Sequence, residues 1–215
     1  KKVSYSAPSV EGQAEIIIGA QAFAEMPPDT ISYIEAHGTG TYIGDPIEIA
    51  ALNKAFKYGT DKKNFCAISS VKANIGHLDS AAGVAGLIKT ALSLKYKKIP
   101  PLINFDYPNH KIDLIDSPFY INSELSNWPE SKHHARRAGV TSIGMGGTNA
   151  HVVLEEHLDI PTSFSNIHKY ILPLSAKTES AVRKMTHNLV DFIITNPEVS
   201  LADIAYTMQT GRKEY

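Results

Sequence analysis

The chain has 215 residues, of which 43% are hydrophobic and 20% charged, the composition of an ordinary globular protein. Its net charge is −1 and its isoelectric point is about 6.8, so no overall basic field is available to hold nucleic acid. No apolar run is long enough for a membrane span or a signal peptide, and no spacing typical of a metal site occurs. A single cysteine excludes an internal disulfide framework. We therefore expect a cytoplasmic protein without nucleic acid, membrane or metal partners.

The first half of the chain is expected to alternate helices with strands. In chain order the hydrophobic patterns predict a helix at 11–25, a strand at 31–36, a helix at 45–56, a strand at 65–68 and a helix at 80–95. Asp45 and Asp79 are the expected N-caps of the second and third helices, since a carboxylate accepts hydrogen bonds from the free amides of a first turn. The third helix is rich in alanine and glycine, so we expect another backbone to approach it closely and to bury it.

The segment that follows is expected to contribute more strands. They are predicted at 119–122, 139–143 and 151–155, with a glycine-rich turn at 144–147 between the last two. Strands that first alternate with helices and then follow one another argue for an α/β layered fold.

The last third of the chain differs in character from the rest. A linker at 158–169 leads to two amphipathic helices, the first capped by Thr178 and the second opened by Ser200. We therefore expect two parts, residues 1–157 and residues 158–215, with the second being a small appendage.

Two histidines stand in parallel contexts in the first part. His37 follows one predicted strand and precedes a Gly-Thr-Gly-Thr loop, and His77 ends a Lys-Ala-Asn-Ile-Gly-His loop after another. The carboxyl ends of strands in α/β sheets usually bind ligands, so the two imidazoles can converge on one carbonyl oxygen or carboxylate as hydrogen-bond donors. Lys72 lies between them in the sequence and would add positive potential. Either histidine taken singly could be an ordinary loop residue, but the long motifs around them favour a functional site.

Three segments carry a resemblance to a known family. The sequences EAHGTGTYIGDPIE at 35–48, SSVKANIGHLDSAAG at 69–83 and GVTSIGMGGTNAHVVLEE at 139–156 resemble the histidine motifs and the closing glycine-rich motif of β-ketoacyl synthases of the thiolase superfamily. Further segments resemble modular type I polyketide synthases and the linker subdomain after their ketosynthases; they lie at 5–9, 117–122, 172–178 and 203–212. The resemblance implies the C-terminal half of a thiolase-like layered α/β/α fold over 1–157, with part of a helical α/β linker subdomain over 158–215.

The resemblance also implies an activity, that of an acyltransferase catalysing decarboxylative condensation. A cysteine takes an acyl chain, and a malonyl-type thioester on an acyl carrier protein loses CO₂ and attacks that chain. His37 and His77 would be catalytic, and Lys72 would support the electrostatics around His77. The residues implied to contact the substrate or its phosphopantetheine arm are Thr39, Thr41, Asn74, Gly144, Met145, Gly146 and Gly147. No cofactor is expected to bind directly, because the phosphopantetheine belongs to the carrier protein, and the complete domain is expected to be a homodimer.

The sequence departs from the family pattern at the nucleophile. No D-x-A-C-S-S-type motif occurs, and Cys66 lies in an apolar strand without a neighbouring base, so we interpret it as a buried core residue. We expect the cysteine to come from an N-terminal half on another polypeptide or a missing segment, and the apolar face that this half would cover to be exposed. Ile143 and Met145 replace the phenylalanines common in the gate motif, which indicates either a roomier acyl tunnel or simple repacking.

Other interpretations stay open from the sequence. The chain could be a non-catalytic docking module that binds carrier proteins through the helices at 178–209. The linker motif favours a modular megasynthase over a free-standing fatty-acid enzyme, and degradative thiolases use a second cysteine as base and lack these histidine motifs. The acyl substrate, elongation as opposed to simple chain transfer, and the source of the acyltransferase stay undetermined.

Overall fold

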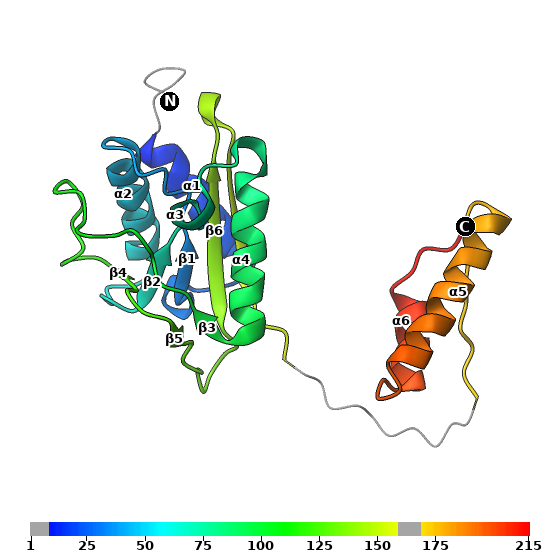
Figure 1. The fold of residues 1–215 in the computed structure, drawn as a ribbon. Helices are drawn as coiled ribbons and strands as arrows, with labels where there is room; N and C mark the ends of the chain where they lie inside the picture. Colours follow the sequence, from blue (N-terminus) through cyan, green and yellow to red (C-terminus); the bar gives the residue numbers. More distant parts are fainter. Residues whose placement is uncertain (1–8, 159–168) are drawn as a thin grey trace. The chain divides into compact units, whose positions relative to one another are not determined.

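The computed structural model describes residues 9–158 and 169–215. The chain divides into two compact units, residues 1–158 and residues 159–215, which are described separately (Figure 1). The first four residues of the polyketide-type segment at 5–9, and nearly all of the expected linker at 158–169, lie outside the described residues.

The first unit is built on a five-stranded sheet with the strand order β4-β2-β1-β6-β7. The strands are β1 (Tyr33–Glu35), β2 (Cys66–Ser69), β4 (Phe119–Ile121), β6 (Arg137–Ile143) and β7 (Asn149–Glu155). The first four are mutually parallel where they pair, and β7 runs antiparallel to β6 as the partner in a tight hairpin. A second, two-stranded sheet that the sequence patterns did not predict joins β3 (Lys98–Ile99) to β5 (Ser126–Asn127).

Helices cover both faces of the main sheet, as Figure 1 shows. On one face α1 (Val10–Phe23) and α2 (Gly44–Lys57) pack together over a core that includes Ile34 and Phe56. On the other face α4 (Ala82–Tyr96) packs over a core that includes Tyr33 and Trp128. Neighbouring residues of β1 thus point to opposite faces, as the two-residue period of a strand requires. The remaining turns are α3 (Lys72–Ile75), η1 (Pro28–Thr30), η2 (Asp79–Ala81) and η3 (Met145–Gly147).

Both predicted aspartate N-caps of the first unit are wrong. Helix α2 begins one residue earlier, and the Asp45 carboxylate turns back to accept a hydrogen bond from the Gly40 amide at 3.1 Å. Asp79 has a φ of 51° and opens the 3₁₀ turn η2, so α4 begins only at Ala82. In each case the aspartate makes a hydrogen bond to the loop before it instead of capping the helix that follows.

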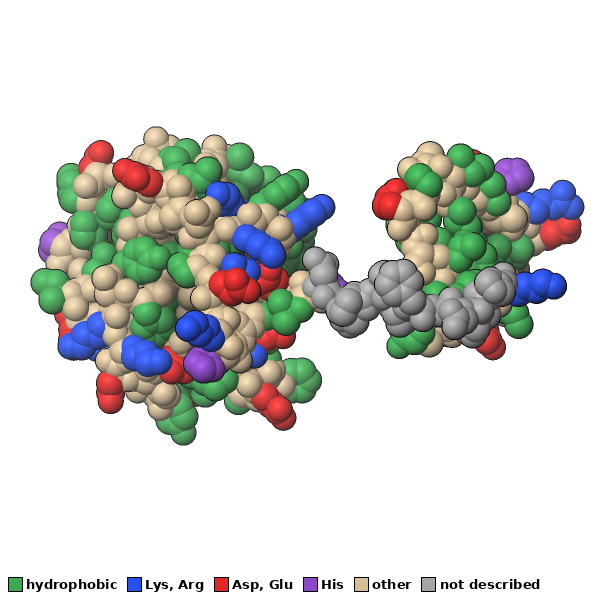
Figure 2. All heavy atoms as spheres, turned by 90° about the horizontal axis from the view of Figure 1, so that it is seen from below, with side chains coloured by type: hydrophobic (Ala, Val, Ile, Leu, Met, Phe, Trp, Pro, Cys, Tyr) green, Lys and Arg blue, Asp and Glu red, His purple; other side chains and the backbone are tan. Residues whose placement is uncertain are grey.

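Helix α4 is buried on one face only. A Cβ atom at Gly83 would lie 2.9 Å from Ser142 Oγ on β6, and one at Gly86 would lie 3.0 Å from Glu35 Cγ on β1. The close approach at these glycines is therefore made by side chains of the sheet and not, as predicted, by another backbone. The opposite face exposes five apolar side chains to between 37% and 65%: Val84, Leu87, Ile88, Leu92 and Tyr96. The predicted exposed apolar face is therefore present. In the view of Figure 2, hydrophobic, acidic and basic side chains are interspersed on the surface.

The second unit contains the helices α5 (Glu179–Thr195) and α6 (Leu201–Thr210). Both predicted caps are confirmed, because Thr178 Oγ1 accepts from the Ala181 amide and Ser200 Oγ accepts from the Ala202 amide, each at 3.2 Å. Over the described ranges, no helix combines the length and the apolar character that crossing a membrane requires.

Candidate active site

The loops after β1 and β2 bring His37 and His77 together. Because these strands are parallel neighbours, their carboxyl ends meet at the same edge of the sheet. The two imidazole rings lie edge to face, with their centroids 5.3 Å apart and their planes at 83°. The structure therefore places side by side the two histidines that the sequence motifs singled out.

A glycine allows the two loops to approach so closely. Gly38 has a φ of +44°, and a Cβ atom there would lie 2.7 Å from Ser70 Cβ on the other loop. Ser70 Oγ uses this space to donate to the Gly38 carbonyl oxygen at 3.2 Å. Any side chain at position 38 would push the loops, and with them the two imidazoles, apart.

Backbone hydrogen bonds define the tautomer of both imidazoles. His37 Nδ1 accepts from the Ile143 amide at 3.3 Å, and His77 Nδ1 accepts from the Asp79 amide at 3.0 Å. A neutral imidazole that accepts at Nδ1 carries its proton at Nε2. Neither Nε2 atom has a hydrogen-bond partner within residues 9–158 and 169–215, so both N–H groups are available to an incoming acceptor.

The surroundings favour the neutral form of His37. Burial lowers its pKa to about 4, with further contributions from the charges of Lys72 and His77. Burial also lowers the pKa of Lys72, against the opposing charges of Glu48 and Glu35. At neutral pH His37 is therefore a hydrogen-bond donor without a net charge.

A buried carboxylate holds the backbone of the His37 loop. Glu48 on α2 is 3% exposed and accepts from the His37 amide at 2.7 Å and from the Gly38 amide at 2.9 Å. Burial nevertheless raises the pKa of Glu48 to about 7. Sequence reasoning covered this residue only as part of the predicted helix at 45–56 and missed its role. The signal available was a glutamate on the first turns of a helix that directly follows the loop it supports.

Two cavities adjoin the His37 loop. One of about 750 Å³ is lined by His37, Thr39, Thr41 and all four residues of the 144–147 loop, so the structure brings most of the predicted substrate-contacting residues together. A neighbouring cavity of about 730 Å³ is lined by Thr39, Thr41 and Lys72.

Not every predicted site residue lines these cavities. His77 and Asn74 are both exposed and lie outside both linings. Met145 is 84% exposed, which leaves it free to move at the cavity rim. Cys66 is buried, as predicted, and burial raises the pKa of its thiol well above the ordinary value, so it is not an activated nucleophile. In the ranges that the structure describes, no cluster of three or more histidine, cysteine, aspartate or glutamate side chains offers a metal site.

A layered α/β fold with two histidine loops at one sheet edge defines a thiolase-like domain, and comparisons with known proteins agree. Residues 1–106 match the C-terminal domain family of β-ketoacyl synthases, and residues 170–215 match the family described as CurL-like, PKS C-terminal. The chain is 44% identical over 218 residues to polyketide synthase PksN of Bacillus subtilis (strain 168), a match that covers 99% of this chain and 4% of PksN.

Solved structures give the same result. The chain is 45% identical, with a TM-score of 0.71, to ketosynthase twelve of the bacillaene polyketide synthase in Bacillus amyloliquefaciens. It is 42% identical, with a TM-score of 0.71, to the ketosynthase from module 6 of the bacillaene synthase of Bacillus subtilis 168. Both matches cover 100% of this chain but 37% of the solved chain. The chain belongs to the β-ketoacyl synthase family, and it corresponds to the C-terminal half of a polyketide synthase ketosynthase domain with the start of the segment that follows.

Proposed function

We propose that this chain forms the decarboxylating and condensing half of a ketosynthase active site. The observation that carries the proposal is the pair of adjacent imidazoles, each held by a backbone amide at Nδ1 so that each offers an Nε2–H group. Two such donors can converge on the carbonyl oxygen of a malonyl-type thioester. They bind it more strongly as it becomes an enolate oxygen, which is where negative charge develops.

The proposed reaction proceeds in two steps. The bond to the extender carboxylate breaks, CO₂ leaves, and its electron pair forms an enolate whose oxygen accepts from the imidazoles of His37 and His77. The enolate carbon then attacks the carbonyl carbon of an acyl-cysteine, and the cysteine thiolate leaves. The product is a β-ketoacyl thioester. The neutral form of His37 suits this step because a cationic imidazole would more readily protonate the enolate carbon and end the reaction without condensation.

The nucleophile in this proposal comes from outside these 215 residues. The sequence contains no D-x-A-C-S-S-type motif, and Cys66 is buried with a raised thiol pKa. We therefore propose that the chain is inactive without the N-terminal half of the ketosynthase, which would supply the acylated cysteine and cover the exposed face of α4.

The substrates are proposed to reach the site on a phosphopantetheine arm. Thr39, Thr41 and the 144–147 loop line the same cavity as His37 and would contact the arm, and the loop amides would hold the acyl-cysteine oxygen. The proposed partners are acyl carrier proteins, which own the phosphopantetheine, and a second copy of the complete domain. The proposed location is the cytoplasm, where acyl thioesters and a free cysteine thiol are stable.

The test separates two steps in the complete ketosynthase domain, or in this chain mixed with the N-terminal half. Cysteine acylation is followed by mass spectrometry with an acyl thioester, and decarboxylation is followed by CO₂ release from a malonyl thioester. His37→Asn and His77→Asn keep an acceptor for the backbone amide but remove the Nε2–H donor. Each is expected to lower decarboxylation by about 100-fold or more while acylation continues.

The exposed His187→Ala on α5 is the matched control and is expected to leave both rates unchanged. If decarboxylation survives both His37→Ala and His77→Ala, the proposed mechanism is wrong. A non-catalytic docking role for α5 and α6 would then be the surviving interpretation.

A further inference from the structure

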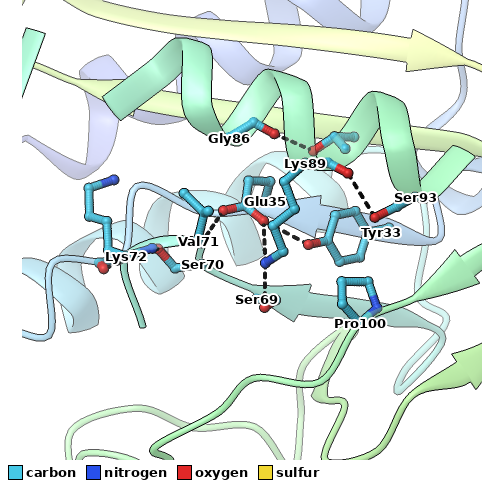
Figure 3. A network of polar contacts seen from close by, with 12 residues as sticks. Tyr33, Glu35, Ser69, Ser70, Val71, Lys72, Gly86, Lys89, Ser93 and Pro100 are labelled. Carbon is cyan, nitrogen blue, oxygen red and sulfur yellow. Dashed lines mark hydrogen bonds and ion pairs between the residues drawn. The ribbon is translucent and has the colours of Figure 1, made fainter. Parts of the chain in front are cut away.

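An ion pair between a buried glutamate, Glu35, and a largely buried lysine, Lys89, lies between β1 and α4 (Figure 3). Glu35 is 1% exposed, and its Oε2 atom lies 2.9 Å from Lys89 Nζ and accepts from the Tyr33 hydroxyl at 2.7 Å. Its Oε1 atom accepts from the Val71 amide. Lys89 Nζ also donates to Ser69 Oγ at 3.0 Å. All the side chains of this cluster have polar partners, and in the part of the chain described no hydrogen bond joins any of them to the imidazoles.

Stability alone is a poor explanation for this pair. Removing two charges from water costs several kcal/mol per ion, and a well-packed apolar pair of similar volume is often as stable. The fold also makes room for the carboxylate, because a Cβ atom at Gly86 on α4 would lie 3.0 Å from Glu35 Cγ. A glycine at this position of the helix leaves space for the buried glutamate. We take this as a sign that the charge has a role beyond stability.

The contacts of the pair connect it to both histidine loops. Glu35 is the last residue of β1 and stands two residues before His37. Its other connection runs through the Val71 amide at the start of the single turn α3, and Gly76 at the end of that turn directly precedes His77. Lys89 fixes the same segment a second time through Ser69 at the end of β2. Glu35 therefore belongs to the strand that leads into His37, while its carboxylate, held by a lysine from α4, accepts a hydrogen bond from the backbone that leads into His77.

We propose that Glu35 and Lys89 are a positioning pair that sets the spacing between His37 and His77. The inference rests on the proposed function, since the spacing matters only if both imidazoles bind one substrate oxygen. Loss of either charge would free the Val71–Gly76 turn and move His77 relative to His37. A displacement of about 1 Å in such a site can lower the rate of the chemical step by about 100-fold.

The test uses the complete ketosynthase domain and the variants Glu35→Gln, Lys89→Met and the double variant. The matched control is Lys95→Met, which removes an exposed lysine from the same helix. Acylation of the cysteine, decarboxylation of a malonyl thioester and the thermal midpoint are measured for each. Both single variants are expected to lower decarboxylation between 10-fold and 100-fold, with acylation within about 2-fold of the parent.

The double variant distinguishes positioning from folding. It leaves no uncompensated buried charge, so its thermal midpoint is expected to recover towards that of the parent while decarboxylation stays low. Equal losses in acylation and decarboxylation, or a decarboxylation rate that recovers together with the thermal midpoint, would show a purely structural pair and overturn the inference. Unchanged decarboxylation in the single variants would overturn it as well. His77→Asn in the same assay keeps the two proposals apart: if that variant retains decarboxylation, the proposed function itself has failed.

Discussion

The carboxylate of Glu48 is expected to make the stability of the domain depend on pH. Burial raises its pKa from an ordinary 4.5 to about 7 even though two backbone amides donate to it. A raised pKa means that the folded state binds the proton more tightly than the unfolded chain. The resulting stability is fully present below pH 4.5 and is lost as the pH rises through about 7. At about 1.4 kcal/mol for each pH unit, the loss approaches about 3 kcal/mol by pH 8.

Glu48→Gln tests this sign, because glutamine is a neutral analogue of the protonated acid. Denaturant unfolding of the complete domain is measured for parent and variant from pH 4.5 to pH 8. The unfolding free energy of the variant minus that of the parent is expected to rise across this range by up to about 3 kcal/mol. Glu15→Gln, at an exposed glutamate on α1, provides the background of the comparison.

Two outcomes would refute the reasoning. A difference that stays flat with pH would show that the carboxylate ionises as it does in the unfolded chain. A difference that falls as pH rises would show that the hydrogen bonds from the His37 and Gly38 amides outweigh the burial of the charge.

Three further predictions concern single contacts. Gly86→Ala is expected to lower stability by about 1 kcal/mol, because the contacts of Glu35 keep its side chain from moving away from a new methyl group. Gly19→Ala on α1, with open space around it, is expected to raise stability by about 0.5–1 kcal/mol. Thermal denaturation of both variants measures the two effects. Cys66 is expected to resist iodoacetamide in the native protein and to react after denaturation, as peptide mass mapping would show, and rapid native labelling would contradict its burial. Thr178→Ala is expected to weaken the start of α5 by about 1 kcal/mol, measurable as faster amide exchange in its first turn, and unchanged exchange would argue against the cap.

Local signals predicted the elements of the fold well. The strands at the sheet centre carry continuous apolar runs, and the helices carry an apolar face, so their positions follow from the sequence alone. The predicted helix caps were wrong where the residue makes its hydrogen bond to a neighbouring loop instead of to the following helix. Asp45 and Asp79 are residues of the type that caps helices, but each makes a hydrogen bond to the preceding loop instead. The Asp45 carboxylate accepts from the Gly40 amide, and the Asp79 amide donates to His77. The two-residue strands β3 and β5 are too short to carry a periodic pattern.

Some residues of the candidate site could also be predicted from local sequence signals, and others could not. His37 and His77 could be predicted because each follows a strand of a parallel sheet, and parallel neighbours end at one edge. The buried acids could not, since their partners come from the packed structure. Glu48 meets the His37 loop across the turn between β1 and α2, and Glu35 meets Lys89 only when α4 lies on the sheet. The only local sign of the contact between Glu35 and Lys89 was the presence of a charged residue, Glu35, in an otherwise apolar strand.

The two carboxylates support the two histidine loops in different ways, and the difference matters for the chemistry. Among the residues that the structure describes, Glu48 accepts hydrogen bonds only from backbone amides, so its charge adds negative potential beside His37, where Lys72 supplies the opposing positive charge. Glu35 meets a full positive charge on Lys89, so it fixes the backbone while adding little net potential behind the imidazoles. A site that stabilises an enolate needs rigid donors and no excess of negative charge around them. Lys89 neutralises Glu35, and Glu48 is partly protonated near pH 7. Both carboxylates can therefore hold the loops rigid without leaving an excess of negative charge around the imidazoles.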